Sequence, residues 1–337
     1  MTLQFHVSES SPLREANGVG PRTEAVPAAE IVSRDTPLMG GRVSVHLQPS
    51  SPAASGAAAR DAELMLTRMA VWAGRLTRFS ATSDLMRLNA DRRTIVPIRP
   101  TLATVLDWGR AAESATEGIV NIAMLDQRLA AEAAKGMATV ADRRVRAASA
   151  WSVDRGARWT SVRRPADLRF DLDGVGKGWI ADRAIARLAG YTASVVDADG
   201  DIAIRLGPGQ AWSVGIEDPT VPDRHLATLR LEGDGHSVHT AFGIATSGRS
   251  VHRWAHDGQT SHHLLDPRTG RPAVTDVIQA TVLADSARHA EVYAKAAVIL
   301  GSAAGLAALD RPGVHGVILV TEEGELLASP GTVRFLS

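Results

Sequence analysis

The stretch ATSGRSVHRWAHDGQTSHHLLDPRTGRPA, residues 245–273, decides how the chain is read. Apolar residues alternate on both sides of Asp257-Gly258, and this alternation predicts two strands joined by a polar turn. Asp266-Pro267 followed by Thr269-Gly270 is typical of a second turn, with Gly270 able to adopt a positive φ. An ordinary hairpin with polar residues at its end would account for these turns.

The same stretch gathers groups that suit a phosphate. It contains the hydroxyls of Thr246 and Ser247, the imidazoles of His262 and His263, and the carboxylate of Asp266. Hydroxyl and backbone N–H groups donate to phosphate oxygens, and glycines let the backbone approach them closely. A plain hairpin does not explain this density, so the pattern favours a phosphate or pyrophosphate site at strand ends.

Composition excludes several classes of function. The 337 residues carry zero net charge and 45% apolar side chains, which gives no case for binding nucleic acid or an anionic membrane. The absence of cysteine excludes disulfides, thiolate chemistry and lipid attachment through cysteine. No apolar run reaches the ~20 residues of a transmembrane helix. The N-terminal residues lack the pattern of a signal peptide, so we expect a cytoplasmic protein.

Lysine is rare in this chain. Of the 37 basic residues only Lys135, Lys177 and Lys295 are lysines, and the rest are arginines. Lysine is a compact point charge that can hold a phosphate or stand in the place of a cation, so each of the three is a candidate functional residue.

The order of patterns predicts an α+β fold with mostly antiparallel sheets and packed helices. Residues 1–38 are rich in Pro, Ser, Glu and Gly and are expected to be disordered or loosely attached, with one domain over 39–337. Helices are expected at 57–79, 100–114, 122–134, 179–188 and 286–300, with a further short helix capped by Ser83 or Asp84. Strands are expected at 42–48, 194–199, 202–206, 212–216, 226–231, 237–245, 278–284, 314–320 and 326–335.

A second informative stretch is FDLDGVGKGWIADRAIAR, residues 170–187. A short strand ending at Asp171, a glycine-rich turn and a helix could cradle a phosphate. The spacing fits neither a Walker A loop nor a dinucleotide fingerprint. A structural glycine turn is the alternative, although the cluster of acid, glycines and Lys177 favours a functional one.

These motifs together resemble the FAD:protein FMN transferases, the ApbE-like flavin transferases. The resemblance runs from Met39 to the C-terminus. It rests on the ordered motifs MGG (39–41), SDLMRLN (83–89), DLDGVGKGWIAD (171–182), WSVGIEDP (212–219), ATSG (245–248), HLLDPRTGRP (263–272) and ATVLADSARHAEVYAKAAVILG (280–301). It implies a T-fold-like α+β architecture with an FAD cleft between lobes. It also implies transfer of FMN from FAD to a threonine of an acceptor protein, with Mg²⁺ and release of AMP.

The resemblance assigns roles by motif position. His263 would be the catalytic base. The metal positions would be the carbonyl of Gly174 together with Glu291 and Lys295. The cofactor-binding residues would be Met39, Phe79, Ile119, Val120, Asn121, Asp171, Lys177, Ser247, Gly248, Leu265 and Asp266.

The chain departs from the family pattern at three positions, two of which are metal positions. Asn121 and Glu291 stand where the family has aspartate, and Lys295 stands where it has a metal-binding threonine. Glu291 can still ligate Mg²⁺, but a protonated lysine cannot and would repel it. Lys295 could instead hold the pyrophosphate directly. The alternatives are therefore an FAD-binding protein with weakened or lost transfer, or an FAD pyrophosphatase; a zinc site near His252 and His256 is disfavoured by strand spacing.

Overall fold

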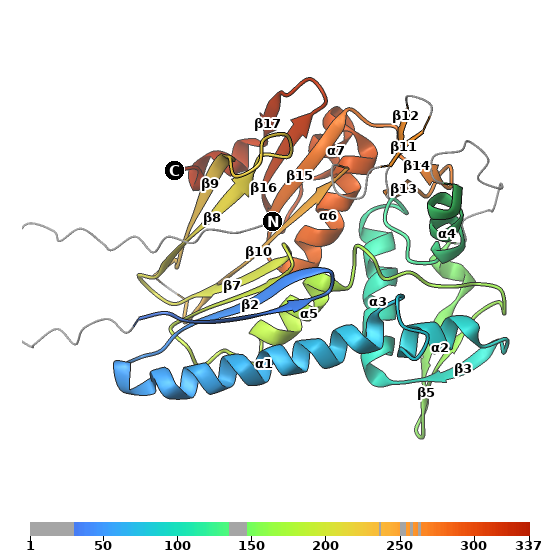
Figure 1. Ribbon diagram of the computed structural model, residues 1–337, viewed down its shortest axis with the longest axis horizontal. Helices are drawn as coiled ribbons and strands as arrows, with labels where there is room; N and C mark the ends of the chain where they lie inside the picture. The colour runs from blue at the N-terminus through green and yellow to red at the C-terminus, as the bar shows by residue number, and fades with distance from the viewer. Residues whose placement is uncertain (1–29, 135–146, 236, 250–253, 257–258, 262–263) are drawn as a thin grey trace, which may run out of the picture.

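An antiparallel sheet of eight strands forms the centre of the computed structural model, which describes residues 30–134, 147–235, 237–249, 254–256, 259–261 and 264–337. Every neighbouring pair in the sheet is antiparallel (Figure 1). From one edge to the other the strands are β1 (Val32–Leu38), β2 (Gly41–Gln48), β6 (Ala193–Ala198), β7 (Ile202–Leu206), β10 (Thr240–Gly248), β15 (Val277–Ala284), β16 (Val314–Thr321) and β17 (Leu326–Ala328).

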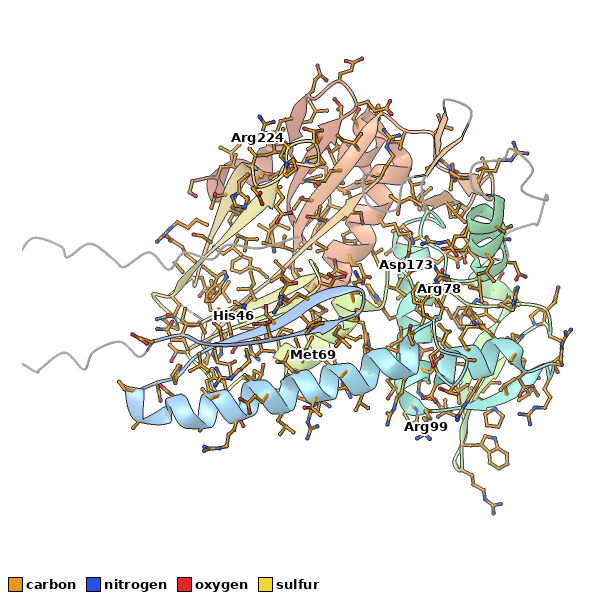
Figure 2. The ribbon with its side chains drawn as sticks, viewed as in Figure 1. His46, Met69, Arg78, Arg99, Asp173 and Arg224 are labelled. Atoms are coloured by element: carbon orange, nitrogen blue, oxygen red, sulfur yellow. The ribbon has the colours of Figure 1, made fainter. Side chains whose placement is uncertain are left out.

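Helices cover one face of this sheet, and a hairpin covers part of the other (Figure 1). The helical layer contains α1 (Ser55–Leu76), α5 (Lys177–Ile185), α6 (Ala287–Leu300) and α7 (Ser302–Ala308). The hairpin contains β8 (Ala211–Glu217) and β9 (His225–Glu232). Strand alternation separates the two cores, because Val196 packs with the helices while Val195 packs under the hairpin. Met69 of α1 is fully buried against the sheet (Figure 2).

A smaller part of the chain lies at the end of α1 (Figure 1). Its elements are α2 (Asp84–Ala90), β3 (Ile95–Ile98), α3 (Pro100–Ala115), α4 (Leu125–Ala134), β4 (Ser152–Arg155) and β5 (Thr160–Arg163). Four short strands, β11 (Trp254–His256), β12 (Gln259–Ser261), β13 (Leu265–Asp266) and β14 (Arg271–Pro272), and three 3-10 turns, η1 (Pro52–Ala54), η2 (Ala148–Ala150) and η3 (Pro330–Phe335), complete the described residues. The expected α+β class is confirmed, and no helix among the described residues is long and apolar enough to cross a membrane.

The expectation that residues 1–38 lack attached structure is wrong for its last seven residues. Val32–Leu38 forms β1, and its pairing with β2 continues from Val32 opposite Leu47 to Leu38 opposite Gly41. Met39 and Gly40 form the two-residue turn, both with positive φ of 59° and 98°. Such a turn matches the twist of paired strands. β1 is polar, as an edge strand can be, and its sequence therefore resembles that of a loop.

Two further expectations about strands need correction. The segment that ends at Asp171 is not a strand, because the side chain of Asn89 takes the place of a neighbouring strand. Asn89 accepts a hydrogen bond from the N–H of Phe170 and donates one to its carbonyl, each at 2.8 Å. The C-terminal strand ends at Ala328, and Pro330 begins η3 because proline has no N–H for a ladder.

Glycines set the position of α6, the helix that carries Glu291 and Lys295. A Cβ on Gly243 of β10 would overlap the backbone of Ser286 at the start of α6. A Cβ on Gly178 of α5 would lie 2.6 Å from the carbonyl oxygen of Ala287. The absence of side chains at both positions therefore lets α6 lie directly against β10 and α5.

Replacing Gly178 by alanine should destabilise the protein. The new methyl group would push α5 from α6 and strain the bond from the Gly178 N–H to Glu291, which is 3.0 Å long. Overpacking of this kind costs about 1–3 kcal/mol. The free energy of unfolding in urea measures the loss.

Gly74→Ala is the matched control, since Gly74 lies in α1 with open space around its Cα. Alanine there should leave stability unchanged or raise it by about 0.5–1 kcal/mol. A Gly178→Ala protein as stable as wild type would contradict the close approach of α5 and α6.

Candidate functional site

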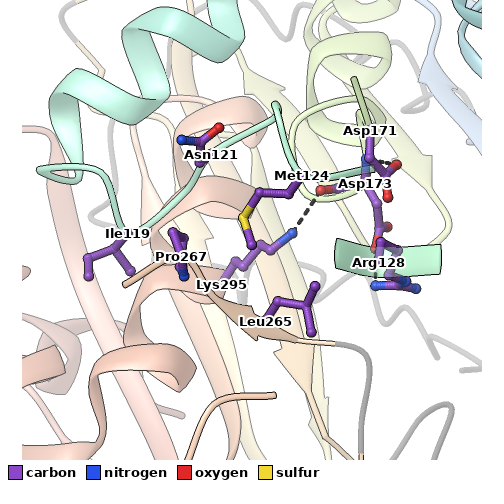
Figure 3. Close-up of a pocket in the computed structure, with 9 residues that line it drawn as sticks. All are labelled: Ile119, Asn121, Met124, Arg128, Asp171, Asp173, Leu265, Pro267 and Lys295. Carbon is purple, nitrogen blue, oxygen red and sulfur yellow. Dashed lines mark hydrogen bonds and ion pairs between the residues drawn. The ribbon is translucent and has the colours of Figure 1, made fainter. Parts of the chain in front are cut away.

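A small cleft, open to solvent, lies where α4, α6 and β13 come together (Figure 3). Residues from four separate parts of the chain form its walls. They are Ile119, Asn121, Met124, Arg128, Asp171, Asp173, Leu265, Pro267 and Lys295.

The structure brings five of the residues expected to bind the cofactor or metal into this one cleft. Ile119, Asn121, Asp171, Leu265 and Lys295 all line it, although they span 177 positions from first to last in the numbering. The chain therefore places the motifs of residues 171–182, 263–272 and 280–301 around one space.

Val120 and Asn121 have mainly structural contacts. Val120 is 2% exposed and belongs to the main core rather than to the wall of the cleft. The side-chain oxygen of Asn121 accepts a hydrogen bond from the N–H of Ala123 at 2.7 Å and so shapes the loop before α4. An aspartate could make the same bond, so the asparagine changes the charge of the cleft more than its shape.

Sequence reasoning missed four residues of the cleft. Asp173 lies inside the quoted DLDG motif and could have been included. Pro267 lies inside the quoted HLLDPRTGRP motif and could have been included too, whereas Met124 and Arg128 carry no local signal, and Arg128 is one arginine among many. Their importance comes from tertiary contacts alone.

Two guanidinium groups balance the carboxylates of the cleft. Arg128 pairs with Asp173 at 3.2 Å and with Glu132 at 2.7 Å. Arg78 pairs with Glu132 at 2.6 Å and lies 3.8 Å from Asp171 (Figure 2). Burial raises the pKa of the Asp171 carboxyl, and the neighbouring charge of Asp173 raises it further.

Lys177 lies at the start of α5, beside the cleft's glycine-rich turn. Its ammonium pairs with Asp199 at 2.5 Å. Burial disfavours the charge of Lys177, but Asp201 and Asp199 outweigh this effect and raise its pKa. A Cβ on Gly41 would overlap the carboxylate of Asp199, so the Met39-Gly40 turn lies against this cluster. In this structure the charge of Lys177 is therefore held by carboxylates.

Glu291 faces the start of α5 rather than open space. It is 4% exposed, and its carboxylate accepts the hydrogen bond from the Gly178 N–H. Burial raises the pKa of Glu291 to about 7, against the opposing effects of that hydrogen bond and of Lys177. Its main contact is structural, as a link between α5 and α6.

Lys295, one helical turn after Glu291, points into the cleft (Figure 3). Its ammonium donates a hydrogen bond to the carbonyl oxygen of Asp173 at 2.8 Å. Gly174 follows with a φ of 87°, and a Cβ there would lie 2.7 Å from the Lys295 nitrogen. The lysine side chain thus fills the space beside Gly174.

The three positions expected to hold Mg²⁺ do not fit that ion. Mg²⁺ requires oxygen ligands in near-octahedral geometry. Glu291 is engaged by Gly178, and the ammonium of Lys295 has no lone pair and occupies the space beside Gly174. In the part of the chain that the structure describes, no three His, Asp or Glu side chains are grouped to hold a metal ion.

The remaining expected residues that the structure describes do not line this cleft. Ser247 and Gly248 end β10, half-buried and paired with β15. Asp266 is 7% exposed and accepts from the N–H and guanidinium of Arg268, so it stabilises its own turn. Phe79 is 83% exposed, with Arg78 stacked 4.2 Å from its ring centre. His263 lies outside the described residues, as do Asp257-Gly258.

The acidic cluster around Lys177 should make stability depend on pH. Burial raises the pKa of Asp197 to about 6. The folded protein therefore holds this proton more tightly than the unfolded chain, in which aspartate titrates near ~3.9. Stability from this group is present below about pH 4 and falls as the pH rises to about 6.

Asp197→Asn should remove this loss while keeping the oxygen that accepts the Gly200 N–H at 2.7 Å. Urea unfolding should show equal stability at pH 4 and a gain of about 1–3 kcal/mol for the variant at pH 7.5. Asp310→Asn, at an exposed position, is the control and should show no such gain. A pH-independent difference between wild type and Asp197→Asn would contradict the raised pKa.

Comparison with known proteins gives relatives of one kind. The chain is 32% identical over 179 residues to the FAD:protein FMN transferase of Salmonella typhimurium, covering 51% of this chain and 48% of that one. It is 30% identical over 191 residues to the enzyme of the same name from Treponema pallidum, covering 53% and 51%. The matches thus span about half the length of these curated relatives.

Solved structures share the fold. The ApbE protein of Thermotoga maritima superposes with a TM-score of 0.73 at 21% identity, covering 91% of this chain and all of that one. The apo form of the Pseudomonas stutzeri flavinyl transferase ApbE gives 0.71 at 21% identity, covering 92% and 98%. A sequence model of the ApbE family matches residues 39–318. With most of its length matched and the same fold, the chain belongs to the ApbE family.

Proposed function

We propose that this protein transfers FMN from FAD to a threonine hydroxyl of an acceptor protein and releases AMP. The observation that carries the proposal is the convergence of Asn121, Asp171, Leu265 and Lys295, from distant motifs, on one open cleft. The names of the curated relatives support the same reaction.

The cleft offers suitable contacts for a dinucleotide. Leu265, Ile119 and Met124 provide apolar surface, while Lys295 and Arg128 provide positive charge for phosphate oxygens. Phe79, in the turn after α1, presents an exposed aromatic ring that a flavin could stack on. FAD, with its apolar ring system and charged pyrophosphate, needs both kinds of surface.

The transfer is a substitution at the phosphorus of the FMN half. The threonine oxygen forms a bond to that phosphorus while the bond to the bridging oxygen breaks. AMP leaves with the electron pair on its phosphate oxygen, and the threonine proton passes to a base. His263 is the proposed base because imidazole accepts a proton near neutral pH. Mg²⁺ is the cofactor that the family resemblance implies, but the described residues do not form its site.

The test is incubation of the protein with FAD and acceptor proteins that contain exposed threonines. Transfer should give a fluorescent acceptor band, an acceptor mass increased by one FMN less one water, and an equal amount of AMP. His263→Ala should slow transfer by about 10²- to 10⁴-fold, the usual contribution of a general base. His225→Ala, at the exposed start of β9, is the control and should react at the wild-type rate.

Two outcomes would replace the proposal by another function. Release of FMN and AMP without acceptor labelling would assign an FAD pyrophosphatase, with water in place of threonine. Tight FAD binding with neither product would assign a flavin-binding protein without transfer.

A further inference from the structure

The positively charged side chain of Lys295 is held in a fixed position in the cleft. It is half-buried on α6, and its neighbours on the helix are buried apolar residues, so its backbone position is fixed by the core. Its ammonium is held by the Asp173 carbonyl at 2.8 Å and lies beside Gly174. A surface lysine would extend into solvent, whereas this one reaches across the cleft to the opposite loop (Figure 3).

The charges around Lys295 make it a suitable anion partner. Asp171 and Asp173 line the same cleft, and the charge of Lys295 acts on Asp171 and on Glu291. Arg128 adds a second positive charge on the wall formed by α4. An incoming pyrophosphate would meet repulsion from both aspartates, so a fixed positive charge at this place is required for it to bind.

Hydrogen-bonding capacity leads to the same conclusion. An ammonium has three N–H donors, and within the described residues Lys295 uses one of them, for the Asp173 carbonyl. The carbonyl bond fixes the direction of the side chain, which leaves N–H groups for a ligand in the cleft. A point charge held in this way can contact two phosphate oxygens at once.

We infer that the Lys295 ammonium, fixed by the Asp173 carbonyl beside Gly174, binds the pyrophosphate of FAD in place of a divalent metal ion. This inference rests on the proposed function and specifies how its site handles charge. The ammonium neutralises part of the charge that builds on the phosphate oxygens as the bond to AMP breaks. The protein should therefore bind FAD, and transfer FMN, without Mg²⁺.

The experiment compares FAD affinity in excess EDTA with affinity in MgCl₂, measured by isothermal titration calorimetry. Wild type should give the same Kd in both. Lys295→Gln keeps a polar N–H group, one bond nearer the backbone, but removes the charge, and should weaken FAD binding by about 10- to 100-fold in both buffers, as expected for a hydrogen bond to a charged group. Arg230→Gln, which removes one charge from an exposed ion pair on β9, is the control and should bind like wild type.

A second measurement does not depend on any variant. Mn²⁺ added to the FAD complex of wild type is followed by electron paramagnetic resonance, where free and bound Mn²⁺ differ. We expect no stoichiometric Mn²⁺ binding. One bound Mn²⁺ per complex, a Kd at least tenfold lower in MgCl₂ than in EDTA, or Lys295→Gln binding FAD like wild type would each overturn the inference.

These readouts separate the inference from the proposed function. Wild type that binds FAD equally well in EDTA and MgCl₂ but labels no acceptor contradicts transfer and supports the role of Lys295. Transfer that occurs only with Mg²⁺ supports the proposed reaction and overturns the inference. A protein that does not bind FAD at all contradicts both.

Discussion

The hydrogen bond from the Lys295 ammonium to the Asp173 carbonyl is the interaction on which the cleft depends. It joins α6 of the helical layer to the loop before α5, and it places a positive charge beside Asp173 in a cleft that Asp171 also lines. A divalent ion would need the space that the ammonium occupies, with oxygen ligands around it. The lysine leaves no such space and provides no oxygen ligand. On the proposed function, the chemistry of the site is set by which cation faces the phosphates of FAD.

The fold provides the rigidity that this contact requires. Gly243 and Gly178 let α6 lie against β10 and α5, and Glu291 links the two helices through the Gly178 N–H. The carboxylate of Glu291 thus contributes to helix packing, whereas the ammonium of Lys295, one turn later, faces the cleft. A methyl group at either glycine would move the ammonium relative to the loop, because the helix moves as a unit.

Local patterns predicted most elements of this fold, and the reasons for the exceptions are physical. Apolar alternation located β2, β7 and β15. A cap for α2 was expected at Ser83 or Asp84, and the structure shows it at Ser83, which accepts from the Met86 N–H at 3.0 Å. β1 was missed because an edge strand can be polar. The segment before Asp171 has the local pattern of a strand, but its partner is the Asn89 side chain, 81 residues earlier. No local pattern reveals that contact.

The candidate site could be predicted only in part for the same reason. Lys295 was identified because lysine is rare in this chain and because it departs from a family pattern. Its contact with Asp173 could be found only from the structure. The same holds for the two arginines that lie beside the carboxylates of the cleft.

The most direct measurement is a crystal structure of the FAD complex grown in MnCl₂, with anomalous data collected for manganese. The account predicts the Lys295 nitrogen at hydrogen-bonding distance, roughly 2.7–3.2 Å, from a pyrophosphate oxygen, with no anomalous peak beside Gly174. A manganese ion bound to the Gly174 carbonyl and the pyrophosphate, with the Lys295 side chain turned away, would contradict it.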